Sequence, residues 1–256
     1  FVATVFNWQF VFILLALIAL FAIAIVFFFL PIGREPDKEV TLQLKPMSKT
    51  YYSILSNTQV FTYTLAGSFS VASLFVYVAG SPIVFMDLYH LSKEAYGGVF
   101  AFLSIGFVGA SQLNIFLVNK FSSVAIFRFA LRVQVLTGIV FVFVAWNGWM
   151  DLNLTLVMLF IFLSCVGLIN PNASALALAP FTKNIGSAAA MMGFSQIGIA
   201  ALASVAVGMF DASSVLPMVL SMASTACVAL IFLLRGEKKM AGNIIEGDSS
   251  AGPAVH

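Results

Sequence analysis

Seven long apolar stretches constrain the fold of this 256-residue chain more than any other feature of its sequence. Each has about 20 residues or more, the length that an α-helix needs to cross the hydrocarbon core of a bilayer. We expect spans at the following residues: Trp8–Ile32, Thr58–Val84, Tyr96–Val118, Phe127–Trp146, Leu152–Ala175, Ile185–Met209 and Val215–Leu234. Because these stretches do not alternate apolar and polar residues, a membrane β-barrel is excluded. The sequence predicts an all-α membrane protein with seven transmembrane helices.

The composition supports a lipid environment for most of the chain. Apolar residues make up 61% of it and charged residues only 9%, whereas about 25% of an ordinary soluble domain is charged. This balance excludes a soluble enzyme and a disordered protein. The net charge of +2 provides no basic field for DNA or RNA. The expected partner is therefore the lipid bilayer, and no nucleic acid is expected.

Residues that carry catalytic or metal chemistry are few. Cys165 and Cys227 lie in separate apolar runs, and the only histidines are His90 and His256. Asp87 lies three residues before His90, but the two have no third ligand and no nucleophile nearby in the sequence. We expect no enzyme activity, no metal and no cofactor.

The basic residues predict the orientation of the spans. Eleven of them fall on one side of the membrane: Arg34, Lys38, Lys45, Lys49, Lys120, Arg128, Arg132, Lys183, Arg235, Lys238 and Lys239. Only Lys93 falls on the other side. Positively charged loops favour the cytoplasm. The N-terminus of the chain is therefore predicted to be periplasmic and its C-terminus cytoplasmic.

An odd number of spans with one long polar connection suggests half of a larger transporter. Twelve-helix transporters consist of two six-helix halves, each a pair of three-helix repeats. We expect residues 1–32 to be the last helix of a missing N-terminal half, and residues 33–57 to be a cytoplasmic linker. Residues 58–235 would form a six-helix bundle, and residues 236–256 a disordered cytoplasmic tail.

Four motifs resemble a known family. They are Gly80-Ser81-Pro82-Ile83-Val84 with Tyr96-Gly97, Gly109-Ala110-Ser111-Gln112-Leu113-Asn114, Gly167-Leu168-Ile169-Asn170-Pro171-Asn172-Ala173, and Gly186-Ser187-Ala188 with Gly193 and Gln196. In this order they resemble the major facilitator superfamily. More narrowly, they resemble its Bcr/CflA-type drug–proton antiporters, which confer resistance to bicyclomycin and chloramphenicol. The resemblance covers the chain up to about Arg235 and corresponds to helices 6–12 of that fold.

The resemblance implies a function and a location. The protein would export small amphipathic, drug-like compounds across the bacterial inner membrane, driven by the proton gradient. No Asp or Glu lies in the middle of a span, so the resemblance implies that the coupling carboxylate belongs to the missing half. Two alternatives stay open: a transporter of the same fold for a specific metabolite, and a non-transporting scaffold or truncated product.

Polar residues inside the spans are the candidates for substrate contact, because polar groups without partners are costly in hydrocarbon. Gln196 lies about 16 Å into its span, near the middle of the bilayer. It is either a cavity-facing amide or part of a small-residue packing seam. Gln112 and Asn114 are two residues apart and cannot face the same way, so at most one faces a central cavity. Met192 either forms an adaptable wall of that cavity or is a lipid-facing or core residue.

Prolines and glycines mark candidate hinges. Pro171 removes a backbone donor and frees the carbonyl of Gly167, while Asn170 and Asn172 can satisfy the freed groups. This arrangement is either a stabilised kink or a broken helix that lines the pathway. Gly80 and Pro82 would form an outer hinge or gate. Gly193, like Gly186, is expected to let two helices approach closely.

Overall fold

The computed structural model describes residues 8–29, 51–52, 54–181, 185–208, 214–240 and 244–245. The chain divides into two units, residues 1–46 and residues 47–256. In the first unit, helix α2 (Trp8–Phe29) contains 22 residues and no charged side chain. Most of the predicted linker, part of the predicted tail, Lys183 and His256 lie outside the described residues.

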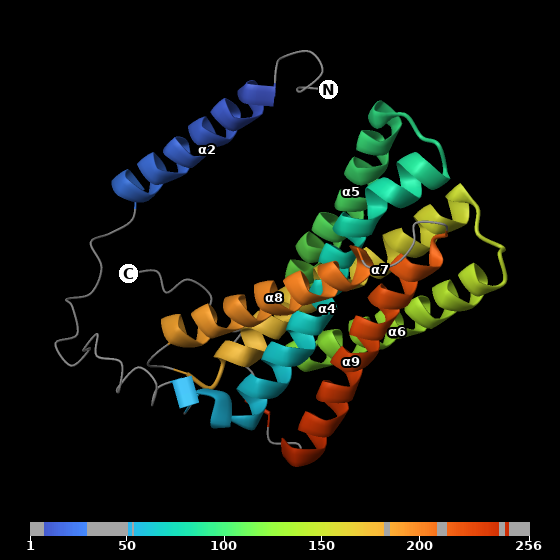
Figure 1. The fold of residues 1–256 in the computed structure, drawn as a ribbon. Coiled ribbons are helices and arrows are strands. Elements are labelled where there is room, and N and C mark those ends of the chain that lie inside the picture. Colours follow the sequence, from blue (N-terminus) through green and yellow to red (C-terminus); the bar gives the residue numbers. More distant parts are fainter. Residues whose placement is uncertain are drawn as a thin grey trace. The chain divides into compact units, whose positions relative to one another are not determined.

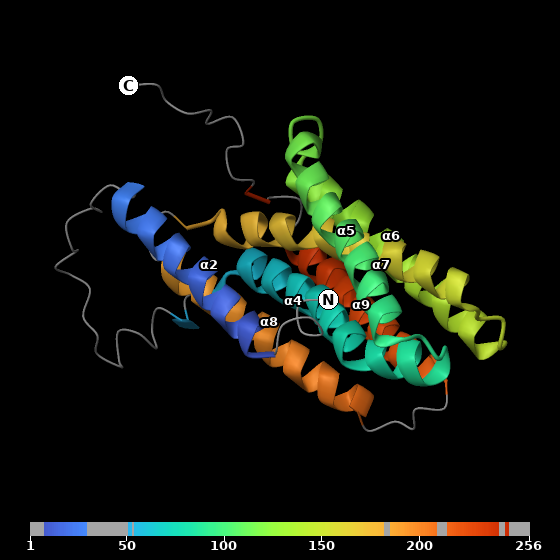
Figure 2. The ribbon, with the colours of Figure 1, turned by 90° about the horizontal axis from the view of Figure 1, so that it is seen from above.

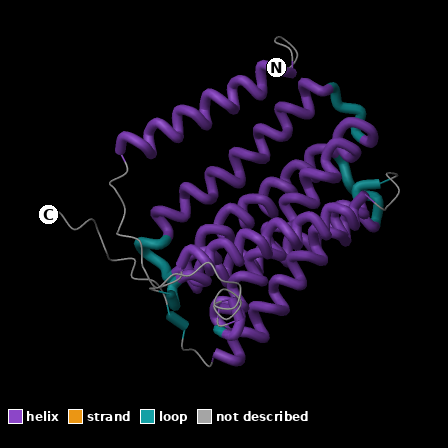
Figure 3. The backbone as a smooth tube through the Cα atoms, turned by 60° about the vertical axis from the view of Figure 1, so that its left-hand side comes forward, coloured by secondary structure: helices purple, strands orange, loops and turns teal. Residues whose placement is uncertain are grey.

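The second unit is a bundle of long helices whose described loops lie at its two ends (Figure 3). Its helices are α4 (Thr58–Pro82), η1 (Ile83–Leu88, a π-helical continuation of α4), α5 (Lys93–Leu117), α6 (Ser123–Trp146), α7 (Leu152–Leu178), α8 (Ile185–Gly208) and α9 (Leu216–Met240). Together with α2, the described residues contain seven helices long and apolar enough to cross a membrane. The predicted all-α fold with seven spans is confirmed.

Polar caps set where several of these helices begin. In each case a side-chain oxygen before the first turn accepts a backbone N–H, which satisfies a donor that has no partner within the helix. The capping residues are Asn57, Ser92, Ser122 and Asp151. Because Ser122 caps α6, this helix begins four residues before the predicted start at Phe127. Arg128 and Arg132 therefore lie inside α6.

The six helices of the bundle pack in a pattern that repeats after three helices. Helix α4 packs against α7, α8 and α9, and α7 packs against α4, α5 and α6. Exchanging α4 with α7, α5 with α8 and α6 with α9 leaves these closely packed pairs unchanged, whereas the smaller contacts of α8 with α7 and α9 have no equally packed counterpart at α5. Figure 2 shows α4 between α8 and α9, as this pattern requires. The bundle is therefore a pair of three-helix repeats, as expected for half of a twelve-helix transporter.

Helices α4, α7, α6 and α9 form, in this order, a closed ring in which each helix packs against the next and α9 packs against α4. Helix α5 lies outside this ring against α7, and α8 lies outside it against α4 (Figure 1). In α5 the buried residues are Leu103, Gly106 and Asn114, so most of its surface is uncovered within the bundle. We call the side on which α5 and α8 flank the central pair α4 and α7 the α5–α8 face.

Charge separates the two ends of the bundle. The end where α4 begins and α9 ends carries the cations Lys120, Arg128, Arg235, Lys238 and Lys239 with a single described acid, Glu237, and we call it the basic end. The opposite end carries Asp87, Glu94 and Asp151 together with Lys93, and we call it the acidic end.

Helix α9 extends five residues beyond the predicted end of the bundle at residue 235. Two features stabilise this extension. Gly236 is buried against Thr62 of α4, and Lys238 and Lys239 lie in the last turn, where cations interact favourably with the helix dipole. Beyond the helix, within the predicted tail, the backbone N–H of Ile245 donates to Oε1 of Gln59 at 2.9 Å.

Candidate functional site

An amide pair joins α7 to α8 on the α5–α8 face. Nε2 of Gln196 donates to Oδ1 of Asn170 at 3.2 Å, and both side chains are half-buried. Gln196 is the twelfth residue of α8, which places it about 16 Å along the helix. An amide group has two donor hydrogens and an acceptor oxygen. Among the described contacts, this bond leaves the Gln196 oxygen and the Asn170 nitrogen available to a further partner.

A second amide pair joins α7 to α5. Nδ2 of Asn172 donates to Oδ1 of Asn114 at 2.7 Å and to the carbonyl of Leu168 at 2.8 Å. Asn172 is 1% exposed, and its own Oδ1 has no partner among the described residues. Gln112 is exposed while Asn114 is buried, which confirms that the two residues face different ways. The candidate amide Gln112 therefore lies outside this buried contact.

Pro171 does not interrupt α7, which is α-helical from Leu152 to Leu178. The side chain of Asn172 bonds the carbonyl of Leu168, one residue beyond the Gly167 carbonyl that Pro171 leaves free. Gly167 itself lies against the backbone carbonyl of Phe107 in α5. A side chain at this position would separate α5 from α7.

Pro82 changes the type of helix instead of ending it. The residues that follow it form the π-helix η1, in which the N–H of Tyr89 bonds the carbonyl of Val84 at 3.0 Å. Proline cannot donate to the carbonyl four residues earlier, and a π-helical turn accommodates such a defect. Gly80 is buried, and a Cβ atom there would lie 2.9 Å from Cγ of Met218 in α9. The candidate hinge thus lies at a packed contact between α4 and α9.

Two placements differ from the sequence-based expectation for α8. A Cβ atom at Gly193 or at Gly186 would meet nothing within 4 Å. The expectation that these glycines allow a close helix approach is therefore wrong for the described helices of this chain. Met192, in contrast, is 4% exposed and packs in the core, with its Cε atom 4.0 Å from the position of a Cβ at Gly67.

An aromatic groove, not expected from the sequence, lies between α4 and α5. It has a volume of about 210 Å³, and its floor is Leu163 of α7. Its walls include Phe75, Tyr77, Phe100 and Phe107, and the rings of Tyr77 and Phe100 stack at 6.2 Å. When the two three-helix repeats are exchanged, α4 and α5 take the places of α7 and α8. The groove between α4 and α5 then corresponds to the contact between α7 and α8 at Gln196. The groove and the amide pair therefore lie on the same α5–α8 face.

A buried polar cluster at mid-depth was also not expected. Gln134 of α6 is fully buried and reaches across the four-helix ring to α4. It accepts from Oγ of Ser70 at 2.7 Å and donates to Oγ of Ser73 at 3.1 Å. An amide at membrane depth, together with two serines three residues apart on another span, was the signal that could have found it. Since it is enclosed in the ring, we assign this cluster to helix association.

Cys165 and Cys227 are free thiols, and the described residues contain no group of three or more His, Cys, Asp or Glu side chains that could hold a metal ion. The buried polar side chains among the described residues are amides and hydroxyls, which bind by hydrogen bonding.

Comparison with known proteins agrees with this architecture. The chain is 26% identical over 230 residues to a bicyclomycin resistance protein homologue of Haemophilus influenzae, covering 89% of this chain and 56% of that protein. It is 23% identical over 239 residues to an uncharacterised MFS-type transporter, YdgK, of Bacillus subtilis, covering 92% of this chain and 58% of that protein. The chain thus spans somewhat more than half the length of these relatives. Residues 1–205 match the family described as the Major Facilitator Superfamily. With its two three-helix repeats and seven membrane-spanning helices, the chain belongs to the Major Facilitator Superfamily of membrane transporters.

Proposed function

We propose that this chain is the C-terminal part of a drug:proton antiporter of the bacterial inner membrane, which exports small amphipathic compounds. The observation that carries the proposal is the pairing of polar and aromatic groups on the α5–α8 face. A half-buried amide pair lies there between α7 and α8 at membrane depth, and an aromatic groove lies between α4 and α5. Apolar walls with a few placed polar groups are typical of small-molecule sites. The printed name of the Haemophilus influenzae relative supports drug resistance as the biological role.

The α5–α8 face is where we place the missing N-terminal half. Large apolar side chains are exposed on both flanking helices, among them Phe102 and Ile105 on α5 and Phe194 and Ile197 on α8. In transporters built from two halves, the substrate binds near the bilayer midplane between repeats, and the halves rock around it. In this arrangement Gln196 and Asn170 face the substrate, and the missing half provides the proton-carrying carboxylate.

The separation of charge between the two ends supports the orientation. Since basic residues concentrate on the cytoplasmic side of membrane proteins, we place the basic end in the cytoplasm and the acidic end in the periplasm. The C-terminus would then be cytoplasmic and α2 would begin at the periplasmic side.

An efflux assay on the whole protein tests the proposal. Cells expressing it should expel a fluorescent lipophilic cation, and a protonophore should stop the export. Gln196→Leu should lower the export rate about fivefold, because one hydrogen bond contributes about 1 kcal/mol. Ser195→Ala is the matched control, since the Ser195 hydroxyl bonds only the Met191 carbonyl of its own helix among the described contacts, at 2.9 Å.

Three results would contradict parts of this proposal. Export that continues with the protonophore present excludes proton coupling. Equal rates for Gln196→Leu and Ser195→Ala, at equal protein levels, remove Gln196 from the substrate site. Transport restricted to one hydrophilic metabolite would replace drug efflux with metabolite transport.

A further inference from the structure

A groove at the basic end, distinct from the α5–α8 face, lies between the start of α4 and the end of α9. Its volume is about 340 Å³. We define the basic-end groove by six of its lining residues: Thr58, Phe61 and Thr62 from α4, and Phe232, Arg235 and Lys239 from α9. The proposed transport function uses none of them.

The groove is built where α4 and α9 cross closely. Gly236 of α9 lies directly against the side chain of Thr62, and a Cβ atom there would overlap it. The Thr62 hydroxyl donates to the carbonyl of Thr58 at 2.6 Å, which fixes it on the floor of the groove. Arg235 and Lys239 flank Gly236 and are one helical turn apart, so they extend from the same side of α9.

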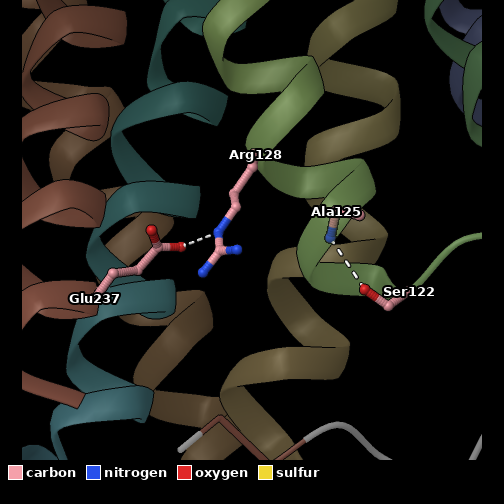
Figure 4. Close-up of polar contacts among 4 residues, drawn as sticks. All are labelled: Ser122, Ala125, Arg128 and Glu237. Carbon is pink, nitrogen blue, oxygen red and sulfur yellow. Dashed lines mark hydrogen bonds and ion pairs between the residues drawn. The ribbon is translucent and has the colours of Figure 1, made fainter. Parts of the chain in front are cut away.

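No carboxylate among the described residues lines this groove, so its two cations are not neutralised there. The nearest acid in sequence, Glu237, lies on the opposite side of α9 and faces α6. There its Oε1 is 2.6 Å from Nε of Arg128 (Figure 4). The pairing of Glu237 with Arg128 therefore leaves Arg235 and Lys239 as exposed positive charges at the mouth of the groove.

The part of the groove towards the middle of the bundle is apolar and aromatic. Phe61 is 40% exposed, and its ring meets that of Phe232 edge-on at 6.3 Å. Phe232 also stacks on Phe69 of α4, with 5.6 Å between the ring centroids, and Phe69 lies farther from the start of α4 than Phe61 does. The groove thus changes from cationic at its mouth to apolar along the surface that a bilayer would cover.

We propose that the basic-end groove binds an anionic phospholipid. The lipid phosphate lies between Arg235 and Lys239, and an acyl chain follows Phe61 and Phe232. Basic pockets between transmembrane helices on the cytoplasmic side are suited to anionic headgroups. A free phosphate would use the cations alone, whereas a phospholipid uses the cationic mouth and the aromatic wall together. The shape and polarity of the groove therefore favour the lipid.

Lipid binding to the purified full chain tests the proposal. The protein would be titrated in detergent with phosphatidylglycerol or with phosphatidylcholine, and bound lipid measured by native mass spectrometry. We expect phosphatidylglycerol to bind preferentially. The double variant Arg235→Gln/Lys239→Gln should bind it about thirtyfold more weakly, since each of the two cations contributes about 1 kcal/mol near a charged membrane surface. Lys238→Gln is the matched control, because Lys238 is an exposed neighbouring cation that does not line the groove.

The outcomes separate the lipid from other occupants. Equal weakening by Lys238→Gln would mean a diffuse basic surface, and equal binding of the two lipids would mean that the phosphatidylglycerol charge is not recognised. Displacement of the lipid by millimolar inorganic phosphate would assign the site to free phosphate. Each of these results would overturn the proposal.

A further variant controls for loss of folding. Arg235→Lys/Lys239→Arg exchanges the two cations and should retain binding if charge at these positions is what matters. Monodisperse elution of all variants on size-exclusion chromatography is required before their binding is compared. Loss of binding in the exchange variant, with elution unchanged, would also contradict the proposal.

Discussion

Helix packing in this bundle depends on glycines that have a neighbour, and one pair of variants tests this directly. Gly67 in α4 and Gly193 in α8 both lie inside long helices. A Cβ atom at Gly67 would lie 2.6 Å from Cβ of Ala173 in α7, whereas a Cβ at Gly193 would meet nothing within 4 Å. Carbon atoms in contact prefer a separation of about 3.5–4.0 Å. Gly67→Ala therefore requires α4 and α7 to move apart by about 1 Å.

The two variants share one contribution to stability, the helix propensity of alanine, and differ in a second, the packing of the added methyl group. Replacing glycine by alanine inside a helix contributes about 1 kcal/mol of intrinsic stability at either position. Overpacking costs typically 1–3 kcal/mol, and this cost applies only at Gly67. Gly67→Ala should therefore be less stable than Gly193→Ala by about 1–3 kcal/mol.

Thermal unfolding of the purified protein in one detergent measures this difference. For a protein of this size, 1 kcal/mol corresponds to a shift in Tm of roughly 2–4 °C. Gly67→Ala should consequently unfold several degrees below Gly193→Ala. Equal Tm values would refute the reasoning, because they would show that α4 and α7 can move apart without a loss of stability.

Three further predictions concern polar contacts at different depths. Arg128→Gln and Glu237→Gln should each lower stability by no more than about 1 kcal/mol because the pair is partly exposed, and a double-mutant cycle should give a coupling that falls with added salt. Asn172→Leu or Asn114→Leu should cost about 1–3 kcal/mol through the buried amide left behind, and the double variant should cost less than the sum of the two. Burial raises the pKa of Tyr89 above its usual value of 10.0, so its neutral form adds stability below that pH and this stability is lost as the pH rises through the folded-state pKa. The Tm of the wild type should therefore fall more steeply above pH 10 than that of Tyr89→Phe, and parallel profiles would contradict this.

The spans could be predicted from sequence because bilayer thickness fixes their length and hydrocarbon fixes their polarity. Where the predicted ends differ, a local contact explains the difference: Ser122 caps α6 early, and Gly236 extends the packing of α9 on α4. The faces of the helices could not be predicted in the same way. In lipid, both the packed side and the outer side of a helix are apolar, so the periodicity that marks a buried face in water is lost.

The hydrogen-bond partners of the candidate amides could not be predicted from the sequence either. Asn172 and Gln196 could be singled out because an amide is costly at membrane depth, but the sequence did not show which side chains they would bond. Asn114 and Asn170 became partners only through the crossings of α7 with α5 and α8. The cluster of Gln134 could not be predicted because it joins α6 to α4 across the ring, between helices that do not pack directly against each other.

The open space at Gly193 bears on the N-terminal half that we propose for the whole protein. A glycine inside a helix costs about 1 kcal/mol relative to alanine, and within this bundle no neighbour compensates for that cost. Gly193 shares its helix with Gln196, whose amide lies on the α5–α8 face, and with Phe194, which is 77% exposed. Small residues in membrane helices favour close contact with another helix. In the transporter that we propose, a helix of the N-terminal half would pack against α8 at Gly193 and offset this cost, next to the amide pair to which we assign substrate contact.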